Sequence, residues 1–151
     1  MDSTELEGTQ IALDALELPR LEAVVELAYL AAYADGVVTD AERDVFRGHV
    51  SAATKGRLST EGVETLLSAI EAGLATEKRE ERFASIRRRL GEPRLRRAAL
   101  SLAVRVLNAD GVLRTSEMAF VLRAAEALEL PATEAHAILS EEAPASIRAL
   151  R

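Results

Sequence analysis

The sequence predicts an all-α protein, a compact bundle of seven or eight helices in two pseudo-symmetric halves. Of its 151 residues, 48% are hydrophobic but only 3% are aromatic, and Ala and Leu dominate. This composition is typical of closely packed helices and unfavourable for sheets. The chain has only four prolines, and its apolar residues recur with helical spacing instead of alternating as in strands. A motif that occurs twice indicates the two halves.

The repeated motif begins with Ala-Asp-Gly and ends with Glu. It covers residues 34–42 and returns seventy-five positions later at residues 109–117. Each copy follows one apolar run with helical spacing and precedes another, which predicts a duplicated helix–turn–helix unit. Gly36 would allow the left-handed backbone conformation with which many helices end.

The helices that follow the two motifs are expected to start differently. Thr39 and Glu42 have the spacing of a capping box, in which each side chain binds the free backbone N–H of the other residue. In the second copy Arg114 replaces the threonine, so Thr115 or Ser116 is expected to cap the helix instead. The glutamate of the second copy is retained although the box is not, which indicates a second role for its carboxylate.

Apolar spacing and helix-breaking residues predict the order of the helices. The helix that begins at Arg20 and the one at 94–108 are apolar around more than half of their circumference, so both are expected at the centre of the bundle. The helix at 77–90 is highly charged and is expected at the surface. The others are a short helix at 5–17, which Pro19 ends, and helices at 40–53, 116–129 and 133–140. A further helix, capped by Ser59 or Thr60, carries apolar residues up to Leu74, and the tail from residue 144 to 151 is expected to add one turn or to fray.

The chain therefore divides into an N-terminal extension or short helix, residues 1–19, and one helical domain, residues 20–151. The halves of this domain lie at about 20–75 and 76–140. The length is that of a single domain.

Several classes of protein are excluded by composition. Without cysteine the chain can form no disulfide, thiolate metal site or cysteine nucleophile. The acidic N-terminus is unlike a signal peptide, and no apolar run is long enough for a membrane span. A net charge of −6 argues against general binding of nucleic acid. We expect a cytoplasmic protein.

The carboxylates of the two motifs are the first candidate site. In each copy the Asp ends one helix and the Glu lies in the first turn of the next, so Asp35, Glu42, Asp110 and Glu117 could converge if the halves pack about a pseudo-two-fold axis. Such a cluster would repel itself unless it were protonated or bound a cation, and oxygen ligands favour Ca²⁺, Mg²⁺ or Mn²⁺. Asp40 is a possible additional ligand. The alternative is that these residues only form turns and caps.

The spacing from Gly to Glu is also that of the second half of an EF-hand loop. However, Ala31 and Tyr33 would occupy the first and third ligand positions of the first copy. Apolar side chains cannot coordinate a hard cation, so an ordinary EF-hand is excluded.

A basic segment is the second candidate site, because guanidinium groups pair with phosphates and could contact an acidic partner or nucleic acid. The alternative is a solvated face, since Glu77, Glu80 and Glu81 are spaced for ion pairs with Arg82, Lys78 and Arg88. The basic residues are Lys78, Arg79, Arg82, Arg87, Arg88, Arg89, Arg94, Arg96 and Arg97.

The sequence gives no positive indication of catalysis. His49 and His136 are isolated in sequence and are expected to be ordinary residues. Tyr29 and Tyr33 are expected to be packing residues. No phosphate-binding loop or nucleophile triad is present.

Two Ala-Asp-Gly…Glu turns between apolar helices, separated by a charged helix, resemble the tellurite-resistance TerB family over residues 20–140. The resemblance implies an all-helical fold of two related halves. It also implies that Asp35 with Glu42, and Asp110 with Glu117, form two acidic pairs for which metal binding is expected.

These observations lead to a TerB-like, non-enzymatic protein of the stress-response or tellurite-resistance type. It is expected to bind a hard divalent cation that ties the halves together and changes the surface presented to a protein partner. The alternative is a metal-independent interaction module that docks a partner through its acidic or arginine-rich surface. An enzyme that uses paired carboxylates is a third hypothesis, which nothing in the sequence requires.

Overall fold

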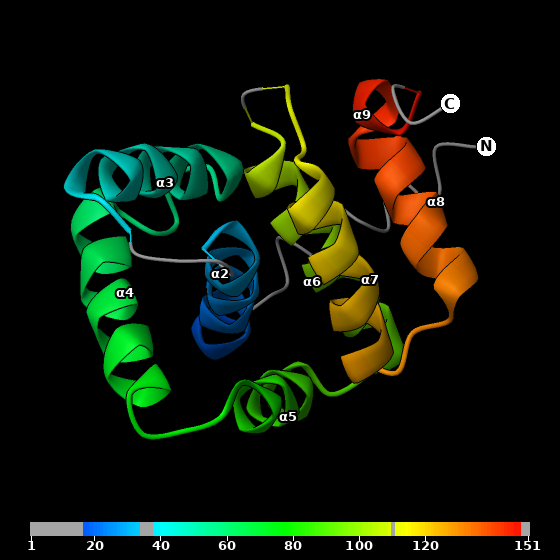
Figure 1. Cartoon of the computed structure of the whole chain (residues 1–151). Helices are drawn as coiled ribbons and strands as arrows, with labels where there is room; N and C mark the ends of the chain where they lie inside the picture. The colour runs from blue at the N-terminus through cyan, green and yellow to red at the C-terminus, as the bar shows by residue number, and fades with distance from the viewer. Residues whose placement is uncertain (1–16, 34–37, 110, 149–151) are drawn as a thin grey trace.

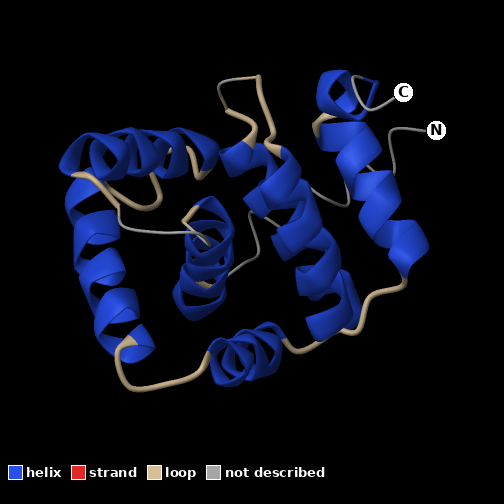
Figure 2. Cartoon of the chain, viewed as in Figure 1, coloured by secondary structure: helices blue, strands red, loops and turns tan. Residues whose placement is uncertain are grey.

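The computed structural model describes residues 17–33, 38–109 and 111–148. Within these ranges it contains eight helices and no strand, which confirms the all-α prediction (Figure 2). The helices are α2 (Leu18–Ala32), α3 (Asp40–Ala53), α4 (Thr60–Leu74), α5 (Arg79–Leu90), α6 (Pro93–Leu107), α7 (Thr115–Ala127), α8 (Ala132–Glu142) and α9 (Pro144–Arg148). The predicted helix at 5–17 falls almost wholly outside the described residues, as do Asp35, Gly36 and Asp110.

Helix α2 lies at the centre of the molecule. Figure 1 shows it surrounded by α3, α4, α5 and the pair α6–α7, with α8 and α9 beyond that pair. Ten of its fifteen residues are buried, because apolar side chains occupy nearly all of its circumference. Helix α6 packs along α2 and buries nine of its fifteen residues. Both helices thus have the central position predicted for them.

Helix α5 covers one end of α2 as an amphipathic surface helix. Only Ile86 and Leu90 on it are fully buried, and Phe83 packs half-buried against Phe120 of α7. Gly91 ends the helix with a φ of +77°, a conformation that is costly for residues with a Cβ atom. The predicted surface position and the predicted stop of this helix are both confirmed.

Several helix boundaries differ from the prediction by one or two residues. Helix α2 begins at Leu18, with Pro19 in its first turn, because a proline there forfeits no helical hydrogen bond. Helix α5 begins at Arg79 and not at Glu77, whose backbone N–H still binds the Gly73 carbonyl at the end of α4. Helix α8 continues to Glu142, two residues beyond its predicted end.

A helix able to span a membrane, which would have to be both long and apolar, is not found in the described ranges.

Candidate functional site

The start of α3 has the complete capping box that the sequence predicts. The Oγ1 atom of Thr39 accepts a hydrogen bond from the Glu42 backbone N–H at 3.1 Å, and Oε1 of Glu42 accepts one from the Thr39 N–H, also at 3.1 Å. The threonine hydroxyl also donates to Oε1 at 2.9 Å. The Thr39 backbone and side-chain hydrogen bonds, in that order, hold the pKa of Glu42 below its usual value.

The start of α7 has half of such a box. Oε1 of Glu117 accepts a hydrogen bond from the Arg114 backbone N–H at 2.9 Å. A guanidinium group has no acceptor, so Arg114 cannot return this bond from its side chain. The prediction that Thr115 or Ser116 caps this helix is wrong. Because the glutamate fixes the Arg114 backbone, α7 keeps the register of α3, and Thr115 becomes its first residue.

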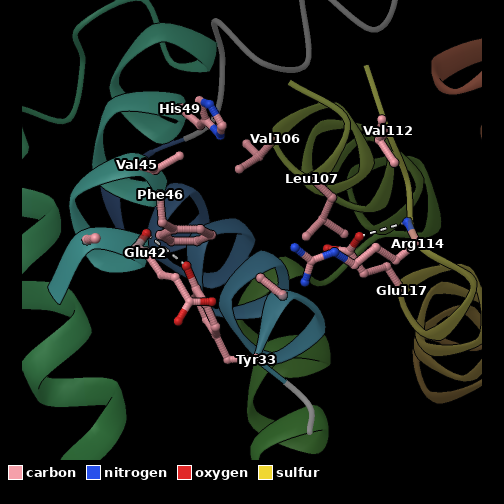
Figure 3. A pocket seen from close by; sticks show the side chains of 12 residues that line it. Tyr33, Glu42, Val45, Phe46, His49, Val106, Leu107, Val112, Arg114 and Glu117 are labelled. Carbon is pink, nitrogen blue, oxygen red and sulfur yellow. Dashed lines mark hydrogen bonds between the residues drawn. The ribbon is translucent and has the colours of Figure 1, made fainter. Parts of the chain in front are cut away.

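The ends and starts of the helices around both motifs meet at one pocket, with a volume of about 280 Å³ (Figure 3). Glu42 reaches it from the first half and Glu117 from the equivalent position of the second half. Glu42 is exposed, whereas only 8% of Glu117 is exposed. Apolar side chains from α2, α3 and α6 form much of the wall. The lining residues are Ala32, Tyr33, Ala41, Glu42, Val45, Phe46, His49, Val106, Leu107, Val112, Arg114 and Glu117.

Tyr33 links the wall of the pocket to the start of α3. Its hydroxyl donates to the backbone carbonyl of Glu42 at 3.0 Å, and its ring lies 5.8 Å from that of Phe46. Burial, and then the negative charge of Glu42, raise the pKa of Tyr33 to about 12. Tyr33 was predicted to be a packing residue, and the structure shows that it also lines the pocket.

The carboxylate oxygens of the pocket match the ligand preference of a hard cation. Among the described residues, however, no group of three or more His, Asp or Glu side chains is placed to hold a metal ion. Glu42 and Glu117 are the two carboxylates that line the pocket. Asp35 and Asp110, the other two predicted ligands, lie outside the described residues.

Much of the arginine-rich segment is used inside the fold. Arg82 and Arg89 both bind the carboxylate of Glu26, each at 2.6 Å. Arg87 donates to the Ala127 carbonyl, and Arg96 donates to the Leu128 carbonyl. The exposed members are Lys78, Arg88 and Arg94. The predicted pair of Arg82 with Glu77 is present at 3.4 Å, but the contact of Arg82 with Glu26 is shorter.

Sequence reasoning did not identify Glu26, which is only 1% exposed. One signal could have revealed it, since Glu26 is the only charged residue within the apolar run from Ala23 to Ala31. A charged residue there requires a partner of opposite charge.

The family model described as Tellurite resistance protein TerB matches residues 21–140. No curated protein and no solved structure matches the chain.

Proposed function

Because the chain belongs to the TerB family of tellurite-resistance proteins, we propose that it is a non-enzymatic stress-response protein that binds a hard divalent cation, Ca²⁺, Mg²⁺ or Mn²⁺. One observation carries the proposal: Glu42 and Glu117, from equivalent positions in the two halves, line the same pocket. The ligands would be Asp35, Glu42, Asp110 and Glu117. A bound cation would supply the positive charge that offsets these carboxylates.

The residues of the pocket support this function through their positions. Each glutamate is held at a helix start by a backbone N–H that binds its Oε1 atom. This fixed geometry limits the entropy that either side chain loses when it binds a ligand. Because Glu42 belongs to α3 and Glu117 to α7, binding at both would tie the two halves together and alter the surface at the pocket mouth.

The test is thermal unfolding of the chelator-stripped chain with Ca²⁺, Mg²⁺, Mn²⁺ or Zn²⁺. At a hundred times the dissociation constant, binding to the native state adds about 2.7 kcal/mol of stability. We expect a hard ion to raise the Tm, and Glu42→Gln, Glu117→Gln, Asp35→Asn and Asp110→Asn each to reduce the shift. Glu126→Gln is the matched control, because Glu126 is exposed on α7 and outside the pocket. If no ion shifts the Tm of the unaltered chain, the proposal fails.

A second candidate function is metal-independent docking of a protein partner at the same pocket. It is favoured by two large apolar side chains at its rim, Val45 and Val112, which are 56% and 60% exposed. A partner that binds equally well in chelator and is lost in Val45→Asp and Val112→Asp would support this function. A partner that is released by chelator would instead support cation-dependent docking.

A further inference from the structure

The two halves of the domain anchor their turns in different ways. Tyr33 ends α2, and Asn108, seventy-five positions later, ends α6 as the equivalent residue. The hydroxyl of Tyr33 donates to the backbone carbonyl of Glu42, in the helix that follows its own turn. The side-chain amide of Asn108 instead donates to the backbone carbonyl of Glu142, at the end of α8, at 2.9 Å. The second turn is thus tied to the C-terminal part of the chain.

Glu142 anchors this C-terminal part on α6. Its carboxylate accepts a hydrogen bond from the hydroxyl of Ser101 at 2.7 Å, and others from Nε and Nη2 of Arg105 at 3.2 and 2.9 Å. A carboxylate in the last turn of a helix interacts unfavourably with the helix dipole, and these two partners offset that cost. The end of α8 is therefore fixed on the helix that leads into the second motif.

Helix α9 extends from this anchor to the second motif itself. Figure 1 shows α9 at the same end of the molecule as the turn between α6 and α7. The hydroxyl of Ser146 accepts a hydrogen bond from the backbone N–H of Leu113 at 3.0 Å, and Ile147 packs partly buried against the core. Leu113 is buried, whereas its neighbours Val112 and Arg114 line the pocket. The bond to Ser146 therefore holds the middle of one wall of the pocket.

We propose that α9, anchored at Glu142, is a strap that positions residues 112–114 and can detach while the rest of the bundle stays folded. A single helical turn is not stable by itself in water, so α9 keeps its shape only while it is docked. Segments at chain ends also open more readily than buried helices.

Detachment of the strap would change the pocket from a distance. Leu113 would lose its hydrogen bond to Ser146, and the wall formed by Val112 and Arg114 would move with it. Anything that binds or displaces α9 would in this way alter the shape of the pocket and of its apolar rim. The inference goes beyond the proposed function, because it does not depend on what the pocket binds.

The test compares amide hydrogen exchange in Ser146→Ala and Ser140→Ala, both in the full-length chain. Ser140 is exposed on α8 and is the matched control. In Ser146→Ala the amides of Leu113 and Arg114 should exchange about fivefold faster, the change expected from the loss of one hydrogen bond. The amides of α2 and α6 should exchange as in the unaltered chain. Ser146→Thr, which keeps a hydroxyl, should restore slow exchange at both positions.

A second measurement follows the wall of the pocket directly, by methyl NMR. The methyl resonances of Val112 should shift in Ser146→Ala and return in Ser146→Thr. Those of Val63, which is buried on α4 and outside the pocket, should stay in place in both variants.

Three outcomes would overturn the strap. Unchanged exchange at Leu113 would show that its bond to Ser146 protects nothing. Faster exchange at Leu113 alone, with Arg114 and Val112 unaffected, would show that this bond acts only locally. Equal acceleration in α2 and α6 would show that α9 opens only when the whole bundle does. Because neither measurement contains a metal ion, each of these outcomes would leave the proposed cation binding to its own test.

Discussion

Glu26 shows how one charged side chain can hold an apolar helix in place. Its carboxylate is only 1% exposed, and each of its oxygens binds a guanidinium group of α5. The Glu26 hydrogen bond is the main cause of the raised pKa of Arg82. Removing one member of a buried ion pair leaves the opposite charge without a partner, which is far more costly than losing a surface pair.

We therefore expect Glu26→Gln to lower the free energy of unfolding by about 3 kcal/mol, the lower end of the range for buried pairs. This end applies because Arg82 and Arg89 keep partial contact with water, with side chains 16% and 29% exposed. Urea unfolding measures the change. Glu22→Gln, one turn earlier on α2 and half-buried, should change it by less than about 0.5 kcal/mol. Equal effects of the two substitutions would show that the pair contributes nothing.

The raised pKa of Tyr33 predicts that the folded protein loses stability at alkaline pH. Its pKa is raised from 10.0 to about 12 in the folded protein. The resulting stabilisation is fully present below pH 10 and is lost as the pH rises towards 12, because only the folded state then resists deprotonation. The pKa of Tyr29 is also raised, by burial and by the hydrogen bond that its hydroxyl donates to Glu71. Tyr33 therefore accounts for only part of the loss of stability at alkaline pH.

The check is to compare Tyr33→Phe with the unaltered chain in urea at pH 8 and pH 11. At pH 8 the variant should be less stable by about 1 kcal/mol, because it lacks the hydrogen bond to Glu42. Between the two pH values it should lose less stability than the unaltered chain does. If the two proteins lose stability in parallel, the hydroxyl of Tyr33 titrates alike in the folded and unfolded states.

Sequence separation decides which of these residues could be predicted. The capping box of Thr39 and Glu42 can be predicted from the sequence, because its two residues lie within one helical turn of each other. The partners of Glu26 lie 56 and 63 residues away, and no local pattern identifies them. Arg114 was recognised as a departure from the motif, but its position in the pocket depends on how the halves pack.

At the level of helices, the threonines at the N-termini of α3 and α7 are expected to differ in how much they stabilise the fold. Thr39 caps α3 through its hydroxyl, so Thr39→Ala should cost about 1 kcal/mol. Thr115 is the first residue of α7 and not its N-cap, and its side chain is exposed. Thr115→Ala should therefore change stability by less than about 0.5 kcal/mol. Urea unfolding in excess chelator measures both. A large loss in Thr115→Ala would show that this threonine is a cap after all.

Helices α3 and α4 are joined by an ion-pair network that predicts sensitivity to acid. Arg43 of α3 binds Glu64 at 2.9 Å and Glu71 at 2.6 Å. The hydrogen bond from Arg43 is the main reason that the pKa of Glu64 is lowered. Burial alone would raise the pKa of Glu71, but its hydrogen bonds from Tyr29 and Arg43 outweigh this effect and lower it.

Because both pKa values are lowered from 4.5, the stabilisation is present above this pH and is lost as the pH falls through the folded-state values. Arg43→Gln should therefore be less stable than the unaltered chain at pH 7, and the difference should shrink at pH 3. Urea midpoints across this range provide the measurement. Arg94→Gln, at an exposed position, should follow the unaltered chain at every pH. A constant deficit in Arg43→Gln would mean that its role is packing and not charge.

At the scale of the molecule, the duplicated motif predicts two related halves but not how they share a core. The buried apolar residues form one cluster that extends from Leu21 to Ala143. Helix α2 of the first half packs mainly against α6 and α5 of the second, and less against its own neighbour α4. The spacing of apolar residues indicates which face of each helix is buried, but it does not identify the helix that covers this face. The enclosure of α2 was therefore predictable, whereas its partners were not.

This arrangement predicts that neither half folds alone. A fragment of residues 1–75 would expose the faces of α2 that α5, α6 and α7 cover, and chains of this length are marginally stable even with an intact core. Residues 76–151 would lose the helix on which α6 packs most extensively. Far-UV circular dichroism should show little helix in either fragment and recovery of helix on mixing, whereas the full-length chain should unfold in a single transition. A cooperative unfolding transition in the isolated 1–75 fragment would instead show that this half has a hydrophobic core of its own. The pocket would then lie at an interface between two domains.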